Sequence, residues 1–127
     1  MPGTKRSRTR FSASAALLLM AAAPDPMRGQ AVVTRQSSTC VLCHAGPFPN
    51  PHLQGDVGPD LHGVGARRSV AELRALLTDA RQVDPGTVMP SFGRTTGLTR
   101  VGAPWAGKPI LSEAEIEDAV AYLASLR

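Results

Sequence analysis

Two thiols and an imidazole stand within five consecutive residues of this 127-residue chain, in the run Cys40-Val41-Leu42-Cys43-His44. Residues three apart share one side of a helical turn, so both thiols can add to the two vinyl groups along one edge of a single porphyrin. The next residue, His44, is then placed to offer a ring nitrogen to the iron. This C-x-x-C-H pattern is the attachment signature of a c-type haem, and the chain has no other cysteine. The sequence therefore predicts one haem c, bound covalently through Cys40 and Cys43 and ligated by His44.

Other roles for the two cysteines fit the sequence less well. A disulfide between them would close a tiny loop and would constrain the unfolded chain little. A redox-active C-x-x-C pair is typical of a βαβ context, and no such pattern surrounds this one. A zinc site would recruit His52 and His62, but these are ten positions apart, whereas finger-like sites leave only about three to five residues between their histidines. Covalent haem is thus the favoured interpretation.

We expect the second iron ligand to be Met89, which lies 45 residues after His44 and directly before Pro90. A methionine thioether partners histidine in many cytochromes c, and the proline stiffens the loop that must hold it. One alternative is that Met89 only packs in the core. Another is that His52 or His62 takes the position, which would lower the reduction potential. The predicted metal ligands are therefore His44 and Met89.

The N-terminal 23 residues read as a secretory signal peptide. Four basic residues, from Lys5 to Arg10, precede an apolar run from Phe11 to Ala23 that ends in small residues. The run is too short to span a bilayer comfortably, so we expect cleavage near residues 21–23, export to the periplasm and no membrane anchor. The leader also carries the excess charge, because the chain has 14 basic and 10 acidic residues and all the acidic ones lie beyond Ala23. The mature protein is then about neutral, and no nucleic-acid partner is expected.

Three helix starts are marked within residues 24–127, a length that suits one small domain. An aspartate before a proline predicts a first helix over residues 26–36. Two capping boxes, each a serine followed three residues later by a glutamate, predict helices over residues 70–78 and from residue 113 to the C-terminus. The apolar residues expected to face inward from these helices are Met27, Val32, Val33, Leu73, Leu76, Leu77, Ile116, Ala119, Val120, Leu123 and Leu126.

Long irregular segments connect these helices. Residues 45–66 are rich in glycine and proline, and residues 80–110 also lack a helical pattern. No stretch shows the alternation of a strand, which predicts an all-α fold. Because the chain has few large side chains, we expect its apolar core to be thin and the haem to fill the middle of it.

The run of residues 58–67, Gly-Pro-Asp-Leu-His-Gly-Val-Gly-Ala-Arg, resembles a stretch of the class I cytochromes c. By this resemblance the carbonyl of Pro59 accepts a hydrogen bond from the second ring nitrogen of His44, which fixes the tautomer and raises the basicity of the ligand. The resemblance also implies that Arg67 lies near a haem propionate. The implied fold is that of a class I cytochrome c, with helices and long loops wrapped around one haem.

Most of the chain beyond the leader resembles, more narrowly, the SoxX family of monohaem subunits of SoxAX sulfur-oxidation cytochromes. The matching motifs, in chain order, are residues 28–29, 43–47, 88–92, 97–101, 107–111 and 117–123. One departure is the absence of the glycine that this family usually has near Ser38 or Thr39. The fold implied by both resemblances would cross its N- and C-terminal helices near Gly29 and Tyr122.

The SoxX resemblance implies electron transfer within a periplasmic complex. The implied partners are a SoxA-like cytochrome subunit with one or two haems, a SoxY-type carrier protein and a downstream electron-accepting cytochrome. Complexes of that family oxidatively couple thiosulfate to a cysteine of SoxY, an L-cysteine S-thiosulfotransferase activity. This chain is expected to supply no catalytic residue of its own, since its two cysteines are taken by haem. The alternative is a free-standing soluble monohaem electron carrier.

Overall fold

The computed structural model describes residues 21–127. The signal peptide predicted for residues 1–23 therefore lies almost wholly outside the described residues. Within the described range the chain forms helices and no strand, which confirms the all-α prediction, and no helix there is long and apolar enough to cross a membrane. The α-helices are α1 (Pro26–Thr34), α2 (Cys40–Cys43), α3 (Val64–Arg67), α4 (Val70–Val83) and α5 (Glu113–Ser125), and the 3₁₀ helices are η1 (Gln36–Ser38), η2 (Pro51–Leu53) and η3 (Ala103–Trp105).

The three predicted helix starts are confirmed by their caps. The Asp25 carboxylate accepts a hydrogen bond from the backbone N–H of Met27, 2.8 Å away, at the start of α1. Both capping boxes are formed, by Ser69 with Glu72 at α4 and by a second serine and glutamate pair at α5. Each cap satisfies backbone N–H groups that have no partner inside the helix, and is worth about 1 kcal/mol.

Two boundaries differ from the sequence prediction. The helix expected over residues 26–36 ends at Thr34, and a 3₁₀ turn follows it. The helix expected to end at residue 78 continues to Val83 after a kink at Asp79, whose φ of −153° and ψ of 86° are not helical. The prediction of loop over residues 45–66 also missed the single turn of α3. Segments of about one turn have no room for an apolar stripe, so they leave little signal in the sequence.

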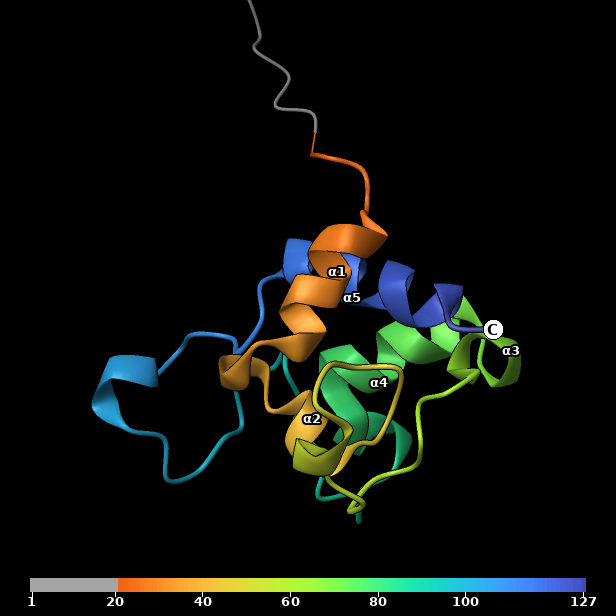
Figure 1. The fold of residues 1–127 in the computed structure, drawn as a ribbon. Helices are drawn as coiled ribbons and strands as arrows, with labels where there is room; N and C mark the ends of the chain where they lie inside the picture. Colours follow the sequence, from red (N-terminus) through yellow and green to blue (C-terminus); the bar gives the residue numbers. More distant parts are fainter. Residues whose placement is uncertain (1–20) are drawn as a thin grey trace, which may run out of the picture.

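The two terminal helices cross at a glycine, as predicted, and Figure 1 shows α1 lying against α5 at the top of the molecule. A Cβ atom on Gly29 would lie 1.9 Å from the carbonyl oxygen of Asp118 and 2.8 Å from the Cβ of Tyr122. Any other residue would therefore push the two backbones apart. A second glycine repeats the device, because a Cβ on Gly65 of α3 would lie 2.2 Å from the carbonyl oxygen of Ala124 near the end of α5.

The apolar core is assembled mainly from α1, α4 and α5. Most of the residues predicted to face inward are buried, and Leu76 and Leu126 are half-buried. Met27 is the exception: it is 80% exposed, so the prediction that it faces inward was wrong. It stands two positions from Gly29, about 200° around the helix, and therefore on the side away from α5. The buried apolar core residues are Val32, Val33, Phe48, Val64, Leu73, Leu77, Ala80, Phe92, Leu111, Ile116, Ala119, Val120, Tyr122 and Leu123.

A buried carboxylate locks the start of α1 onto α5. Asp118 is 7% exposed, and its oxygens accept hydrogen bonds from Arg28 Nε at 2.8 Å, Arg28 Nη2 at 2.9 Å and the Asp25 N–H at 2.7 Å. These bonds favour the ionised carboxylate, and they hold the pKa of Asp118 below its usual value, the Arg28 guanidinium contributing most and the Asp25 amide next.

We predict that Asp118→Asn destabilises the protein near pH 7 and much less in acid. A carboxylate with a lowered folded-state pKa stabilises the fold above its unfolded-state pKa, about 3.9, and loses that contribution as the pH falls through the lower folded-state value. Denaturant midpoints of both proteins between pH 7 and pH 3 should therefore converge below about pH 4. Asp56→Asn is the control, because Asp56 is exposed and forms no ion pair within residues 21–127. A gap between Asp118→Asn and the parent that stays constant with pH would contradict the prediction.

Candidate functional site

One cavity of about 710 Å³ collects all the residues that the sequence singled out for haem binding. Its volume falls within the roughly 300–1,000 Å³ range of cofactor and small-molecule sites, and most of its wall is apolar. The apolar wall comes from α1, α4, α5 and the loops around Leu61 and Val88. The predicted site residues that line this cavity are Cys40, Cys43, His44, Pro59, Arg67 and Met89.

The two thiols occupy a single helical turn, α2, at the cavity wall. Both cysteines are free and partly exposed. Burial raises the pKa of the Cys40 thiol, which opposes the thiolate form that redox chemistry requires. No cluster of three or more metal-binding side chains occurs within residues 21–127, so the alternative zinc site with His52 and His62 is not formed. The disulfide alternative is likewise not formed in this structure.

Thr39, which directly precedes this turn, has a φ of 61° and a ψ of 3°. That left-handed conformation is easy for glycine and unfavourable for a β-branched residue. The SoxX resemblance leads one to expect a glycine near this position, and this chain builds its turn from a residue less suited to that conformation. The first cysteine is thereby presented to the cavity at the cost of local backbone strain.

The imidazole of His44 is held by a backbone carbonyl. Its Nδ1 lies 2.6 Å from the Pro59 oxygen, the contact that the class I resemblance implied. A carbonyl only accepts, so Nδ1 carries the proton and Nε2 keeps a free lone pair for a metal ion. Pro59 itself has no N–H to donate, so the loop is held by backbone hydrogen bonds on either side of it. Gly58 N–H donates to the Cys43 oxygen at 2.7 Å, and Leu61 N–H donates to the Ala45 oxygen at 2.8 Å. The loop is thus tied to the haem motif on both sides of Pro59.

Gly58 contacts the histidine ring directly, a role that the sequence reasoning did not assign to it. A Cβ atom at this position would lie 2.4 Å from His44 Cε1 and 2.7 Å from Nδ1. Gly55 makes a similar approach, since its Cβ would lie 1.9 Å from the Leu42 oxygen. Glycine is required at both positions because backbone packs against the turn that carries the thiols and the imidazole. The sequence does show a glycine directly before Pro59. Only the structure shows that this glycine lies against the His44 ring.

Arg67 braces the same loop from the other end. Its guanidinium donates hydrogen bonds to the backbone oxygens of His62 and, at 2.6 Å, of Asp60, while the residue also lines the cavity. The Asp60 carboxylate in turn pairs with His62 Nδ1 at 2.7 Å, and the His62 amide lowers the pKa of Asp60 most. His62 is exposed and, like His52, is not among the described residues that line the cavity. Arg67 therefore has a structural role in addition to the propionate contact expected of it.

Met89 reaches the cavity from a loop that α4 holds in place. It is partly buried against the apolar core, and its backbone N–H donates to Thr87 Oγ1 at 3.1 Å. Three residues later, Phe92 N–H donates to the Leu77 oxygen at 3.0 Å, and Gly93 N–H donates to the Thr78 oxygen at the same distance. The kink in α4 follows directly after these two carbonyls. In a straight helix the carbonyls of Leu77 and Thr78 would accept hydrogen bonds from N–H groups of the same helix. Here they accept from the segment that follows Met89.

The kink residue itself anchors this loop a second time. Ser91 Oγ donates to Asp79 Oδ1 at 2.6 Å, and Arg94 lies 3.8 Å from the other carboxylate oxygen. The Ser91 hydroxyl, followed by the Arg94 charge, holds the pKa of Asp79 below its usual value, so the carboxylate is ionised at neutral pH. Asp79 therefore fixes the segment immediately after Met89, a role without any signal in the local sequence.

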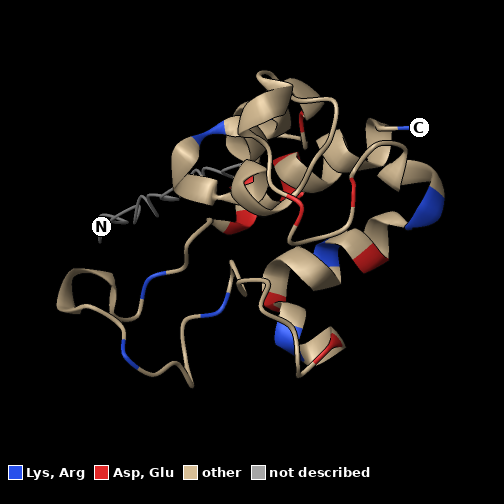
Figure 2. Cartoon of the chain, turned by 60° about the horizontal axis from the view of Figure 1, so that its bottom comes forward, with Lys and Arg blue, Asp and Glu red and all other residues tan. Residues whose placement is uncertain are grey.

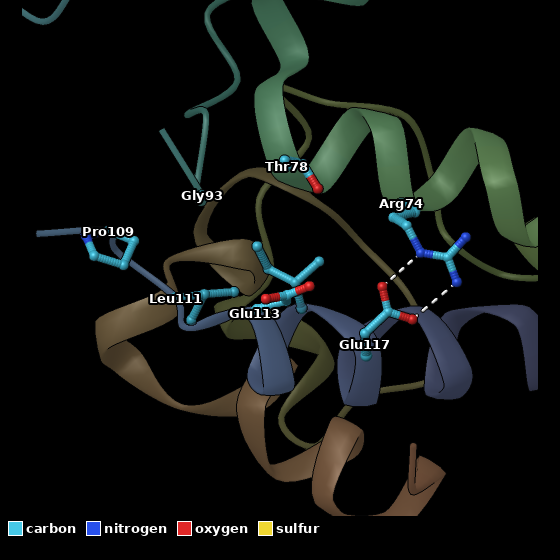
Figure 3. A pocket seen from close by; sticks show the side chains of 8 residues that line it. Arg74, Thr78, Gly93, Pro109, Leu111, Glu113 and Glu117 are labelled. Carbon is cyan, nitrogen blue, oxygen red and sulfur yellow. Dashed lines mark hydrogen bonds and ion pairs between the residues drawn. The ribbon is translucent and has the colours of Figure 1, made fainter. Parts of the chain in front are cut away.

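A second, smaller cavity of about 350 Å³ lies between α4, the start of α5 and the chain around Gly93 and Pro109. Figure 3 shows Arg74 and Glu117 paired at its edge, with Nη2 and Oε2 2.8 Å apart. The pairing neutralises both charges, and the lining holds no thiol, imidazole or thioether. This cavity lacks the donors that the larger one provides.

The residues of the larger cavity fit a covalently bound haem. They provide two free thiols three positions apart, an imidazole whose Nε2 lone pair is free, and a thioether from a different segment. The wall between them is apolar, which suits a porphyrin, and a guanidinium is present for a carboxylate.

Comparison with known proteins agrees with this chemistry. The family model for cytochrome c matches residues 26–127. Among solved structures, the crystal structure of SoxXA from P. pantotrophus is similar, with a TM-score of 0.74 and 35% sequence identity over 83% of this chain and 83% of that chain. No curated protein matches the chain.

We predict that Gly58→Ala perturbs the histidine without detaching the haem. The added methyl group must displace the His44 ring or the loop, and overpacking of this kind costs about 1–3 kcal/mol. The thermal midpoint should fall, and the reduction potential should shift because the Nδ1 contact with Pro59 sets the basicity of the ring. Gly86→Ala is the matched control, since the nearest atom to its added Cβ is 3.5 Å away. Equal effects of the two substitutions would contradict the proposed contact.

Proposed function

The chain belongs to the cytochrome c family as a SoxX-like member with one covalent haem c, and from this premise we propose that it is the electron-transfer subunit of a SoxAX-type complex. The observation that carries the proposal is the single cavity that gathers the C-x-x-C-H turn and Met89. The haem supplies reversible one-electron exchange at its iron when bound. Enzymatic activity would then belong to the complex rather than to this chain alone.

Each site residue has a distinct part in this proposal. Cys40 and Cys43 hold the porphyrin covalently, and His44 ligates the iron through Nε2. The Pro59 carbonyl keeps the proton of that ring on Nδ1, which is supported by the 2.6 Å contact. The mostly apolar wall would limit contact between the porphyrin and water, which is one of the factors that set its potential.

We propose Met89 as the second iron ligand and Arg67 as a propionate partner. Met89 is supported over the histidines because it lines the cavity, whereas His52 and His62 are exposed elsewhere in the described chain. The two anchors that follow it, Phe92 to α4 and Ser91 to Asp79, support a loop stiff enough for a weak thioether ligand. Arg67 is supported by its place at the cavity, although two of its donors already serve backbone oxygens.

The physiological setting is proposed from the similarity to SoxXA. The partner would be a SoxA-like cytochrome subunit, and the pair would oxidatively couple thiosulfate to a cysteine of a SoxY-type carrier. In that coupling the thiosulfate sulfur bonds to the cysteine sulfur, one proton leaves the thiol, and two electrons pass to the cytochromes. This chain would relay those electrons to a downstream cytochrome. The leader of residues 1–23 would deliver it to the periplasm.

We predict that Met89→Ala leaves the haem attached and changes its iron. Attachment depends on the cysteines, so the colour should stay with the protein after extraction with acidified organic solvent. The weak absorption of the oxidised protein near the red end, which reports sulfur–iron bonding, should disappear. The potential should fall by on the order of 0.1 V, a modest part of the about 0.8 V that axial ligands span.

The control for this substitution is Met27→Ala, because Met27 is 80% exposed and does not line the cavity. It should leave both the absorption band and the potential unchanged. Survival of the band and the potential in Met89→Ala would instead make Met89 a packing residue and return the assignment to a histidine.

We predict a stable heterodimer with a SoxA-like cytochrome. Size exclusion of protein purified from its native source should give a mass well above that of one small domain. Thiosulfate should reduce the haem of this chain when the SoxA-like subunit and a SoxY-type carrier are both present, and not when either is omitted. A monomer that reduces another cytochrome without any partner would identify a free-standing carrier and overturn the proposal.

A further inference from the structure

The longest stretch between α-helices in the described chain, residues 84–112, contains an arm formed by residues 93–110, which Figure 1 shows projecting from the helical body on the side of η3. Its two ends are pinned together, because the N–H groups of Ile110 and Leu111 both donate to the Phe92 oxygen, at 2.8 and 3.0 Å. Every residue from 95 to 110 is exposed. Apart from the three residues of η3 the arm has no secondary structure, and loops of this length are uncommon and often functional.

The arm exposes large apolar side chains that contribute nothing to the core. Trp105 is 69% exposed, Ile110 51%, Leu98 41% and Val101 40%. The backbone hydrogen bonds of Trp105 are local. Its backbone N–H donates to the Gly102 oxygen at 2.9 Å, and its carbonyl oxygen accepts from the backbone N–H of Lys108. Leaving these side chains in water forgoes the stabilisation that burial of their apolar surface would provide. Large exposed apolar patches mark interaction sites, and tryptophan is among the residues enriched at the energetic centre of interfaces.

The charge on the arm is of one sign. No aspartate or glutamate occurs between residues 85 and 112, whereas the arm carries Arg94, Arg100 and Lys108. Figure 2 shows the projecting segment with blue positions and no red one. Arg94 is partly committed to Asp79 at the base, so Arg100 and Lys108 are the positive charges that flank the apolar side chains. A basic rim around an apolar centre is complementary to an apolar pocket bordered by carboxylates.

We propose that this arm is the docking surface for the second cytochrome subunit, an inference that rests on the proposed function. Trp105 inserts into an apolar pocket of that subunit, and Arg100 and Lys108 face carboxylates at the rim of the pocket. The arm begins within four residues of Met89, and its base is fixed to α4 through Phe92. A partner seated there lies beside the end of the segment that runs from Met89 to Phe92, two residues that line the large cavity.

The test measures the affinity of the purified holoprotein for the SoxA-like subunit by calorimetry, and their association rate by stopped-flow mixing. Trp105→Ala should weaken binding about tenfold or more, as expected of a central aromatic residue. The double variant Arg100→Glu with Lys108→Glu should slow association and flatten its dependence on salt, since rim charges act mainly on the encounter rate. The visible spectrum and thermal midpoint of each variant alone should match the parent, because the three side chains are exposed.

Two controls match these changes outside the arm. Leu53→Ala removes an apolar side chain that is 70% exposed on η2, and Arg127→Glu reverses an exposed charge at the C-terminus. Both should bind like the parent. If the parent binds the SoxA-like subunit and the arm variants bind equally well, the arm proposal is overturned while the proposed function stands. If the parent does not bind at all, the proposed function fails and the arm proposal with it. A homodimer of the parent that Trp105→Ala dissociates would assign the arm to a second copy of the chain and overturn the proposal.

Discussion

The contact between His44 Nδ1 and the Pro59 carbonyl is the constraint around which this small protein is organised. An imidazole can ligate iron only through a nitrogen that has no proton, and the carbonyl 2.6 Å from Nδ1 keeps Nε2 in that state. For the carbonyl to reach the ring, residues 55–61 must lie directly against the C-x-x-C-H turn. Backbone hydrogen bonds tie the two segments together, and Gly58 allows the approach because it has no side chain to meet the ring. A loop without regular secondary structure is therefore among the most closely fixed parts of the molecule.

The helices α1 and α4 both pack against α5 and leave a large cavity beside their shared core. The crossing of α1 with α5 is closed by Gly29 and by the buried Asp118 carboxylate, so these helices are positioned without large side chains between them. The core that results is thin, with Phe48, Phe92 and Tyr122 as its only buried aromatic residues in the described chain. The large cavity lies beside this core rather than outside it, since Leu73, Leu77 and Leu123 belong to both. A porphyrin in the cavity would extend the apolar core, so cofactor binding and folding are coupled in this chain.

Local rules were enough to predict a large part of this arrangement. The caps at Asp25, Ser69 and Ser112 act within four residues, so the sequence alone locates the three main helices. The C-x-x-C-H run and the glycine at the helix crossing are also readable without a structure. What could not be predicted depends on contacts between distant residues. Asp79 breaks α4 where Ser91, twelve positions later, supplies a partner for its carboxylate, and nothing near Asp79 in the sequence announces that partner. The prediction for Met27 failed for a local reason. Its apolar side chain was expected to face inward like those of Val32 and Val33, but it lies on the other side of the helix.

Two departures from ideal local structure lie at the walls of the cavity. Thr39 adopts a left-handed conformation at the residue before the first thiol, and α4 kinks at the two carbonyls that receive the Met89 loop. Neither feature stabilises the helix that it precedes or interrupts. Both turn backbone or side chains toward one space, on segments that are separated by about 40 to 50 residues in the chain. Stable folds tolerate such violations where function requires a fixed geometry and the surrounding contacts enforce it. Here the enforcing contacts are the bonds from Ser91 and Phe92 on one side and the Pro59 loop on the other. These two departures from local preference therefore help to hold the proposed ligands His44 and Met89 toward a common centre.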